Sequence, residues 1–145
     1  MQHCCIYIAI MEPKRILQEH KLKRTACREG ILSTMLTTGY PLSENKIRDG
    51  LKGNFDRTTF YRSFKTLLEK RIIHKIVVDN QVVKYALDNS VTHKNKHAHF
   101  YCKKCDSVIC LDTVPVQEPE IPQGFEASET EIIIKGLCSS CKNLK

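Results

Sequence analysis

Two pairs of cysteines are the residues of this chain whose types and spacing point most directly to chemistry. They are Cys102 with Cys105 and Cys138 with Cys141, and each pair encloses two residues. A Cys-x-x-Cys turn presents two thiolates to one ion, and four thiolates at the corners of a tetrahedron suit Zn²⁺. Because such a closed set leaves no position for a substrate, the pattern predicts a structural zinc site rather than a catalytic one.

The cysteine pairs are also compatible with a redox dithiol, a disulfide or a chance arrangement. The pairs are separated by 32 residues, so a shared ion would join the ends of a small subdomain. Two pairs at this spacing favour zinc over these alternatives. The lysine-rich composition and the lack of an evident signal peptide favour a reducing, cytoplasmic setting with metal-bound thiolates.

The positive charge of the chain is concentrated in its first part. Residues 1–92 hold 16 Lys and Arg against 9 Asp and Glu, whereas residues 93–145 hold 7 of each kind. A basic part joined to a neutral, cysteine-bearing part is typical of a nucleic-acid binder with a separate regulatory or assembly module. The charge alone is equally compatible with a solvated basic surface. No apolar run approaches the roughly 20 residues of a membrane helix.

The first part is predicted to fold as four helices followed by a β-hairpin. Capping residues and the period of the apolar residues indicate the helices. Asp79-Asn80 is a two-residue turn that would join two β-branched runs. Helices followed by a hairpin indicate a winged helix. The helices are expected at residues 13–20, 26–37, 43–51 and 57–70, and the strands at residues 72–78 and 81–87.

The fourth helix is the candidate for contact with DNA. Its apolar residues recur at helical spacing from Phe60 to Leu68, which directs the basic and hydrogen-bonding side chains toward the surface. With the short helix before it, it would form a helix–turn–helix whose second helix enters the major groove. The alternative is that Arg57 and Arg62 only solvate an amphipathic helix, and the periodicity does not separate the two interpretations.

The second part is predicted to be a small sheet joined by the metal. Alternation places His97 and His99 on one side of a strand that leads to Cys102. Further strands are expected at residues 108–111, which include Cys110, and at residues 130–135. Prolines between them disfavour a long helix at residues 114–123. About 50 residues provide too little core for secure folding, so zinc or dimerisation would stabilise this part.

Four strings of residues resemble the ferric uptake regulator (Fur) superfamily, over about residues 12–142. Two are Asp56-Arg57-Thr58-Thr59-Phe60-Tyr61-Arg62, and Thr25-x-x-Arg28 followed by Ile31-Leu32. The others are His97-x-His99-x-x-Cys102-x-x-Cys105 and Lys135-Gly136-x-Cys138-x-x-Cys141. The resemblance implies a homodimeric repressor that binds a double-stranded DNA operator and is not an enzyme.

The resemblance also implies the domain organisation and the roles of individual residues. The fold would be α+β, with a winged-helix DNA-binding domain and a small α/β dimerisation domain that carries a Cys4 zinc site. The bounds would be 1–10 for an N-terminal extension, 11–88 for the DNA-binding domain, 89–96 for a hinge and 97–145 for the dimerisation domain. The structural zinc ligands would be Cys102, Cys105, Cys138 and Cys141, and the DNA-binding residues Lys23, Arg57, Thr58, Tyr61 and Arg62.

The chain departs from the family at the position of its regulatory metal site. The family's two strand histidines match His97 and His99, but Tyr40, Ala86 and Thr130 stand where other ligands are usual. Cys110 replaces a carboxylate, which disfavours the sensing of iron because that sensing relies on hard oxygen ligands.

Three alternatives follow for regulation. His97, His99 and Cys110, with His93 or Glu126, would form an altered site for a second, softer metal such as zinc. Otherwise the regulator lost metal control and binds DNA constitutively or responds to thiol chemistry at Cys110. In the third alternative the histidines are ordinary polar strand residues and Cys110 is buried.

Two rival functions come from other classes of protein. One is a zinc-ribbon module that binds RNA or protein, with the helices docking a partner. The other is a dithiol oxidoreductase, which is disfavoured because no thioredoxin-like βαβ pattern surrounds either cysteine pair and a closed tetrathiolate is inert. Neither a membrane partner nor a small-molecule substrate is expected.

Overall fold

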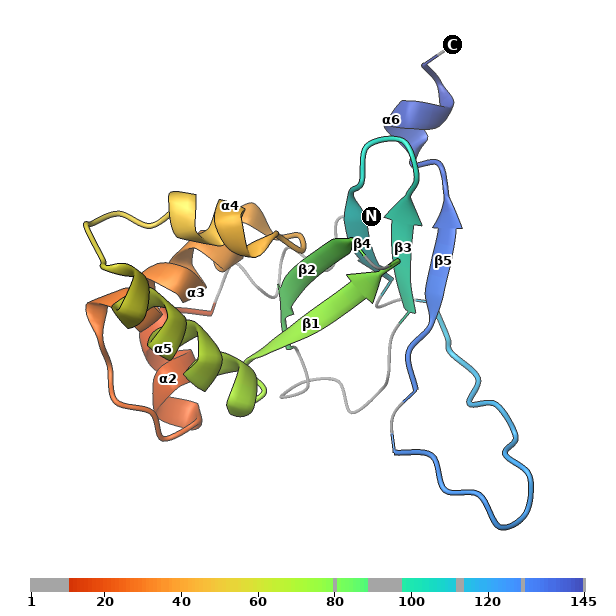
Figure 1. The fold of residues 1–145 in the computed structure, drawn as a ribbon, viewed down its shortest axis with the longest axis horizontal. Coiled ribbons are helices and arrows are strands. Elements are labelled where there is room, and N and C mark those ends of the chain that lie inside the picture. Colours follow the sequence, from red (N-terminus) through yellow and green to blue (C-terminus); the bar gives the residue numbers. More distant parts are fainter. Residues whose placement is uncertain (1–10, 80, 89–97, 112–113, 129, 145) are drawn as a thin grey trace. The chain divides into compact units, whose positions relative to one another are not determined.

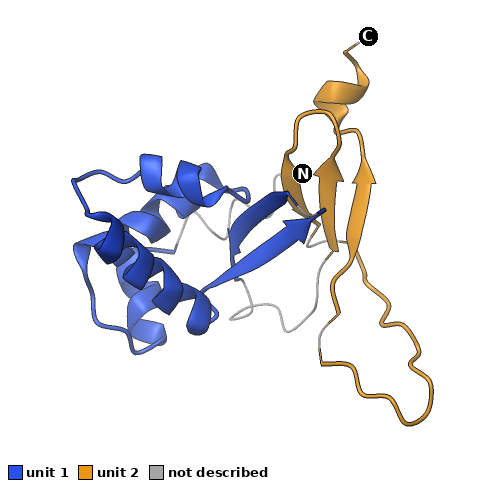
Figure 2. Ribbon diagram, in the orientation of Figure 1, with its two compact units in different colours: residues 1–89 blue, residues 90–145 orange. Residues whose placement is uncertain are grey.

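The computed structural model describes residues 11–79, 81–88, 98–111, 114–128 and 130–144. The chain divides into two compact units, one within residues 1–89 and one within residues 90–145 (Figure 2). The expected extension at 1–10 and the expected hinge at 89–96 lie outside the described residues, so the predicted domain bounds stay a prediction. None of the described helices is both long enough and apolar enough to span a membrane.

The first unit contains four helices followed by a two-stranded hairpin (Figure 1). Three helices begin where the sequence predicted, because the side chains of Thr25, Ser43 and Asp56 each accept a hydrogen bond from a backbone amide three residues later. The predicted helices are confirmed, with ends that differ by one or two residues. They are α2 (Pro13–Glu19), α3 (Ala26–Thr38), α4 (Glu44–Asp49) and α5 (Arg57–Glu69).

The hairpin consists of β1 (Ile73–Val78) and β2 (Val82–Leu87), which pair antiparallel. The last pair is Val78 with Val82, so three residues lie between the strands and the predicted two-residue turn is wrong. Gln81 stays in the loop rather than in the ladder, and Asp79 has a left-handed φ of 55°. Two hydrogen bonds of 2.8 and 2.9 Å between the backbones of Tyr85 and Leu42 connect the hairpin to the segment before α4.

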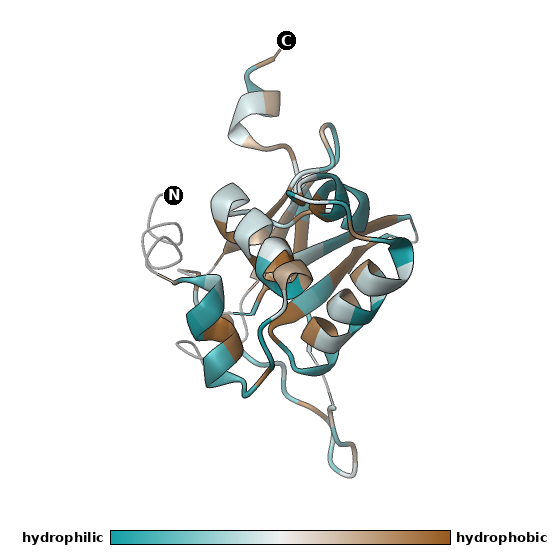
Figure 3. Ribbon diagram, turned by 90° about the vertical axis from the view of Figure 1, so that its left-hand side faces the viewer, coloured by the Kyte–Doolittle hydropathy of each residue, from teal (hydrophilic) through white to brown (hydrophobic). Residues whose placement is uncertain are grey.

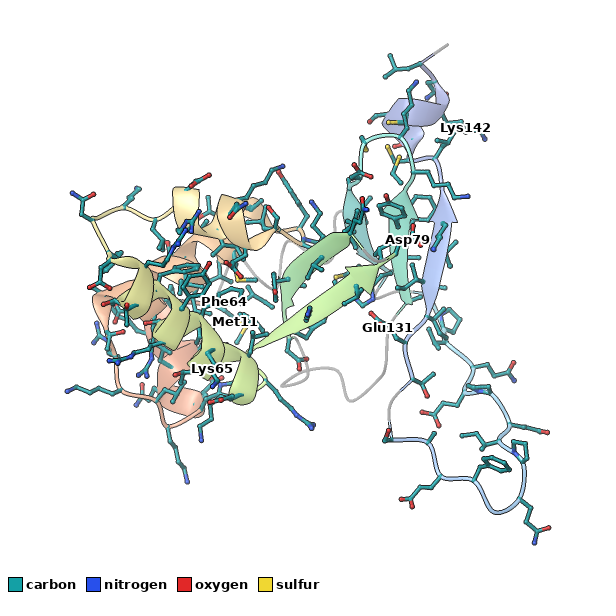
Figure 4. All side chains as sticks on the ribbon, in the orientation of Figure 1. Met11, Phe64, Lys65, Asp79, Glu131 and Lys142 are labelled. Atoms are coloured by element: carbon teal, nitrogen blue, oxygen red, sulfur yellow. The ribbon has the colours of Figure 1, made fainter. Side chains whose placement is uncertain are left out.

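The core of the first unit lies between the helices and the hairpin, and Figure 3 shows that its helices carry both hydrophilic and hydrophobic residues. Phe64 of α5 stacks on Phe60 with ring centroids 5.5 Å apart and meets Tyr85 of β2 edge-on at 4.8 Å. This contact fixes α5 against the hairpin and leaves the side with Lys65 in solvent (Figure 4). The most completely buried side chains of the core are Leu17, Ile31, Leu32, Ile47, Phe60, Leu67 and Ile73.

The second unit contains a three-stranded sheet and one turn of helix. The strands are β3 (Ala98–Cys102), β4 (Val108–Leu111) and β5 (Ile133–Gly136), in the order β4-β3-β5, and the helix is α6 (Ser139–Lys142). β3 pairs antiparallel with β4 and parallel with β5. The last strand thus begins three residues later than predicted. Residues 114–128 form neither helix nor strand.

Truncation of Phe64 tests whether α5 is fixed by its aromatic contacts. Phe64→Ala should lower the free energy of unfolding by about 3–5 kcal/mol, because it removes a buried ring and leaves a cavity. Lys65→Ala, at the exposed neighbouring position, should change that free energy by less than about 0.5 kcal/mol. Urea denaturation followed by circular dichroism measures both values, and equal values for the two variants would contradict this packing.

Candidate metal centre and nucleic-acid interface

The four cysteines of the two pairs come together at one end of the three-stranded sheet. Cys102 ends β3 and Cys105 lies in the turn to β4, while Cys138 precedes α6 and Cys141 lies within it. Their sulfur atoms lie within 4.8 Å of one another, and sulfur atoms are visible between this turn and α6 in Figure 4. The parallel pairing of β3 with β5 causes this meeting, because it brings the turns that follow both strands to the same end of the sheet.

The donor set and its dimensions fit Zn²⁺. Four thiolates bound tetrahedrally at about 2.3 Å from one ion would lie about 3.8 Å apart. The sulfur atoms of Cys105 and Cys138 are 3.9 Å apart. Cys102 and Cys141 are buried whereas Cys105 is exposed, so one edge of the cluster reaches solvent. In the part of the chain that the structure describes, these cysteines form the one group of three or more residues that could hold a metal ion.

Hydrogen bonds set different proton affinities within the cluster. The backbone amide of Cys138 donates to Cys102 Sγ at 3.3 Å and lowers the pKa of the Cys102 thiol to about 6. Ser107 Oγ lies 3.0 Å from Cys105 Sγ and lowers the pKa of that thiol as well. A hydrogen bond with Cys138 raises the pKa of the Cys141 thiol to about 12. The cluster therefore favours thiolate at two positions and holds a proton at another, which a metal ion would displace.

Ser107 is a residue of this centre that the sequence analysis missed. Besides its hydroxyl contact with Cys105, its carbonyl accepts a hydrogen bond of 2.9 Å from the backbone amide of Cys102. The amide of Lys103 donates to the carbonyl of Gly136 at 2.9 Å, which joins this turn to the end of β5. The signal that could have identified Ser107 is a hydroxyl residue two positions after the first cysteine pair.

The candidates for a second metal site are described only in part. His93 and His97 lie outside the described residues. His99 is buried and pairs with Cys110 across the antiparallel ladder, so the two side chains lie on the same face of the sheet. Glu126 is exposed. Among the described residues no further metal-binding side chain joins His99 and Cys110 in a group of three, so the second site stays a prediction.

The candidate DNA-binding face is the side of α5 opposite the core. Phe60, Ser63 and Phe64 are buried, whereas the residues from Arg57 to Thr59 and the pair Tyr61 and Arg62 are exposed. Helical spacing places Arg57 one turn before Tyr61, whose ring meets that of Phe60 edge-on with centroids 5.5 Å apart. The sequence-predicted residues of this helix are all exposed: Arg57, Thr58, Tyr61 and Arg62.

The basic segment between α2 and α3 is held by side chains from the first turns of α3. Lys23 is exposed, and its carbonyl accepts a hydrogen bond of 2.8 Å from Arg28 Nη1. Arg24 forms an ion pair of 2.5 Å with Glu29, which lowers the pKa of the Glu29 carboxyl. The backbone of Lys23 is therefore fixed while its ammonium group stays accessible.

Known proteins match this chain in sequence family and in fold. The model of the ferric uptake regulator family matches residues 19–135. The ferric uptake regulator of Helicobacter pylori has a TM-score of 0.61 at 18% identity, over 92% of this chain and 95% of that chain. The ferric uptake regulator of Francisella tularensis with iron has a TM-score of 0.58 at 23% identity, over 83% of this chain and 95% of that chain. A zinc uptake regulator complexed with zinc and DNA has a TM-score of 0.62 at 20% identity, over 89% of each chain. No curated protein sequence matches.

Removal of one cysteine tests the metal centre. Cys141→Ser should reduce the tightly held zinc from about one ion per chain to nearly none, because a closed site needs all four thiolates. Cys110→Ser, which changes a cysteine outside the cluster, should retain that ion. Elemental analysis of protein purified without added metal measures both, and zinc loss in both variants or in neither would contradict the assignment.

The affinity for zinc should fall as the pH falls. Cys141, with a pKa raised to about 12, must release its proton to the metal at any lower pH. Cys102, with a pKa lowered to about 6, binds a competing proton only in more acidic solution. Competition with a chromogenic chelator should therefore show Kd rising at least about tenfold for each pH unit lost near neutral pH, and more steeply in more acidic solution. A constant Kd would refute this expectation.

Proposed function

The chain belongs to the ferric uptake regulator family, and on that premise we propose that it is a homodimeric, DNA-binding transcriptional repressor with a structural zinc ion. The observation that carries the proposal is the exposed basic face of α5, which lies within the residues that the family model matches. The family consists of transcription regulators rather than enzymes.

DNA binding by α5 is supported by its surroundings as well as its residues. α4 and the turn after it precede α5, and the hairpin follows, which is the order of a winged helix. Arg57 and Tyr61 on the exposed face suit contacts with base edges in the major groove, and Arg62 suits a phosphate. Lys23 would enter the adjacent minor groove from its fixed segment. One solved relative of this fold is a zinc uptake regulator complexed with zinc and DNA.

A structural role of the zinc ion is supported by the closed geometry of the four thiols. Two of the cysteines are buried, and the ion would join the β3–β4 turn to α6. Few of the described side chains of the second unit are fully buried, so this link would contribute much of its stability. When bound, the ion supplies a covalent junction between two turns and no substrate chemistry.

A homodimer is supported by the edge of the sheet in the second unit. β5 lies at one edge, where Ile134 and the adjacent Leu137 are exposed. An exposed apolar edge strand is a template for pairing with another strand. A two-fold dimer would present two copies of α5 to successive major grooves of a pseudo-palindromic operator.

Regulation is proposed to act by population shift. A bound ligand would favour the arrangement in which both copies of α5 meet the operator. The proposed ligand is a second, exchangeable zinc ion held by His97, His99 and Cys110. Metal titration separates regulation by zinc from the alternatives. If a second equivalent of zinc does not change the affinity for the operator, the remaining alternatives are control by thiol chemistry at Cys110 and constitutive binding.

Two substitutions on α5 test the assignment to DNA. Arg57→Ala and Tyr61→Phe should each reduce the preference for operator over random duplex by about 1–3 kcal/mol, because each removes a contact with a base. Lys70→Ala, at the far end of the helix, should leave that preference unchanged. The operator is first selected from random duplexes, and fluorescence anisotropy at matched salt then measures both affinities.

Two outcomes would contradict the proposal. Wild-type preference in both α5 variants would show that another surface reads the bases. A preference of the wild-type protein for single-stranded RNA over duplex DNA would favour the zinc-ribbon alternative instead.

A further inference from the structure

Residues 114–128 form an extended segment between β4 and β5, which we call the arm (Figure 1). All of its residues except Val116 are exposed. The amide of Phe125 donates to the carbonyl of Pro122 at 3.1 Å, and Gly124 within this turn has φ of 90°. Its prolines also restrict the backbone, so the arm loses little conformational entropy when it docks.

The arm combines exposed apolar side chains with negative charge. Phe125 is 74% exposed, the largest value among the exposed large hydrophobic residues that the structure describes, and Val114 and Ile121 are exposed too. Glu118, Glu120 and Glu126 belong to the arm, which contains no Lys or Arg. Exposed apolar side chains on a preformed segment indicate contact with a partner, and the glutamates favour a basic partner over nucleic acid.

A surface with the opposite charge lies at the metal end of the same unit. Lysines and exposed apolar residues alternate there along the end of β5 and through α6. We call this surface the lysine end. It comprises Ile134, Lys135, Leu137, Lys142 and Leu144.

The topology keeps the arm and the lysine end of one chain apart. β3 and β5 run in parallel toward the cysteines, and β4 runs the opposite way. The arm therefore leaves β4 and approaches β5 at the end of the sheet that lies away from the metal centre (Figure 1). The four residues of β5 span about 13 Å, so the arm approaches one end of the strand while most of the lysine end follows its other end.

We propose that the arm docks on the lysine end of a second copy of this chain. β5 is an edge strand, and no strand in the described parts of the chain pairs with its outer side. When two copies meet about a two-fold axis with their β5 strands antiparallel, the start of each β5 lies beside the end of the other. Each arm then meets the lysine end of the other copy, so the contact forms twice.

This inference rests on the homodimer of the proposed function and names the surfaces that hold it together. The arm and the lysine end both carry exposed apolar side chains, and their charges are opposite. The glutamates of one copy would lie near Lys135 and Lys142 of the other, and Phe125 would cover exposed apolar side chains such as Leu137.

A charge exchange between the two surfaces tests the contact. One variant carries Glu120→Lys and Glu126→Lys in the arm, and the other carries Lys135→Glu and Lys142→Glu at the lysine end. Alone, each variant brings like charges together, so its dimer dissociation constant should rise at least about tenfold. In an equimolar mixture both contacts of a heterodimer join opposite charges, so dimers should form with nearly wild-type affinity.

Sedimentation of the full, zinc-loaded chain at about 0.1 M salt measures these constants. The control carries Glu12→Lys and Asp49→Lys in the first unit, which change the net charge equally and should leave the dimer intact. Phe125→Ser should also weaken the dimer, whereas Tyr40→Ser, which removes an exposed aromatic ring of the first unit, should not.

Each further outcome bears on one proposal. Wild-type dimers from both charge variants alone, or monomers in their mixture, would overturn the arm contact. If the variants give either of these results while the wild-type protein binds duplex DNA, the proposed function stands without this contact. If the variants dissociate alone and form dimers in their mixture, but the wild-type protein binds no duplex DNA, the contact stands and the proposed function is overturned.

Discussion

The parallel pairing of β3 with β5 is the constraint on which the second unit depends. It registers His99 with Ile133 and Cys102 with Gly136, so the turns after both strands emerge at one end of the sheet. The four thiols meet there because of this register. Parallel strands need a long connection, and here that connection consists of β4 and the arm. The same pairing leaves β5 at an edge and sends the arm to the opposite end of the sheet.

The metal centre and the small sheet support each other. A unit of this size buries little apolar surface, so a link between its two turns has a large effect on its stability. In return, the sheet orders the groups around the sulfur atoms. The amide of Cys138 points at Cys102 Sγ and the hydroxyl of Ser107 contacts Cys105. These groups stabilise thiolate charge before any metal arrives, which reduces the cost of assembling the site.

In the first unit the packing of the core holds the basic face of α5 outward. The aromatic contacts of Phe60, Phe64 and Tyr85 bury one side of α5 against the hairpin. The opposite side is then left to Arg57 and Tyr61, whose positions follow from the rotation of the helix. The proposed binding to DNA would therefore depend on apolar contacts that do not touch the DNA. The segment around Lys23 is arranged in the same way, since Arg28 of α3 holds its backbone while the Lys23 side chain is exposed.

The sequence by itself determined the local elements, because caps such as Thr25 and Asp56 and the apolar period of α5 act within a few residues. It also predicted that the two cysteine pairs would meet, since Cys-x-x-Cys spacing encodes the turn that each pair needs. It missed the three-residue loop after Val78 and the contact of Ser107 with Cys105, because both depend on how one strand is registered against another. Only the tertiary structure decided that β3 and β5 are parallel, that the arm and the lysine end lie at opposite ends of the sheet, and that His99 faces Cys110. Such relations join residues far apart in the chain, and no local pattern of side chains specifies them.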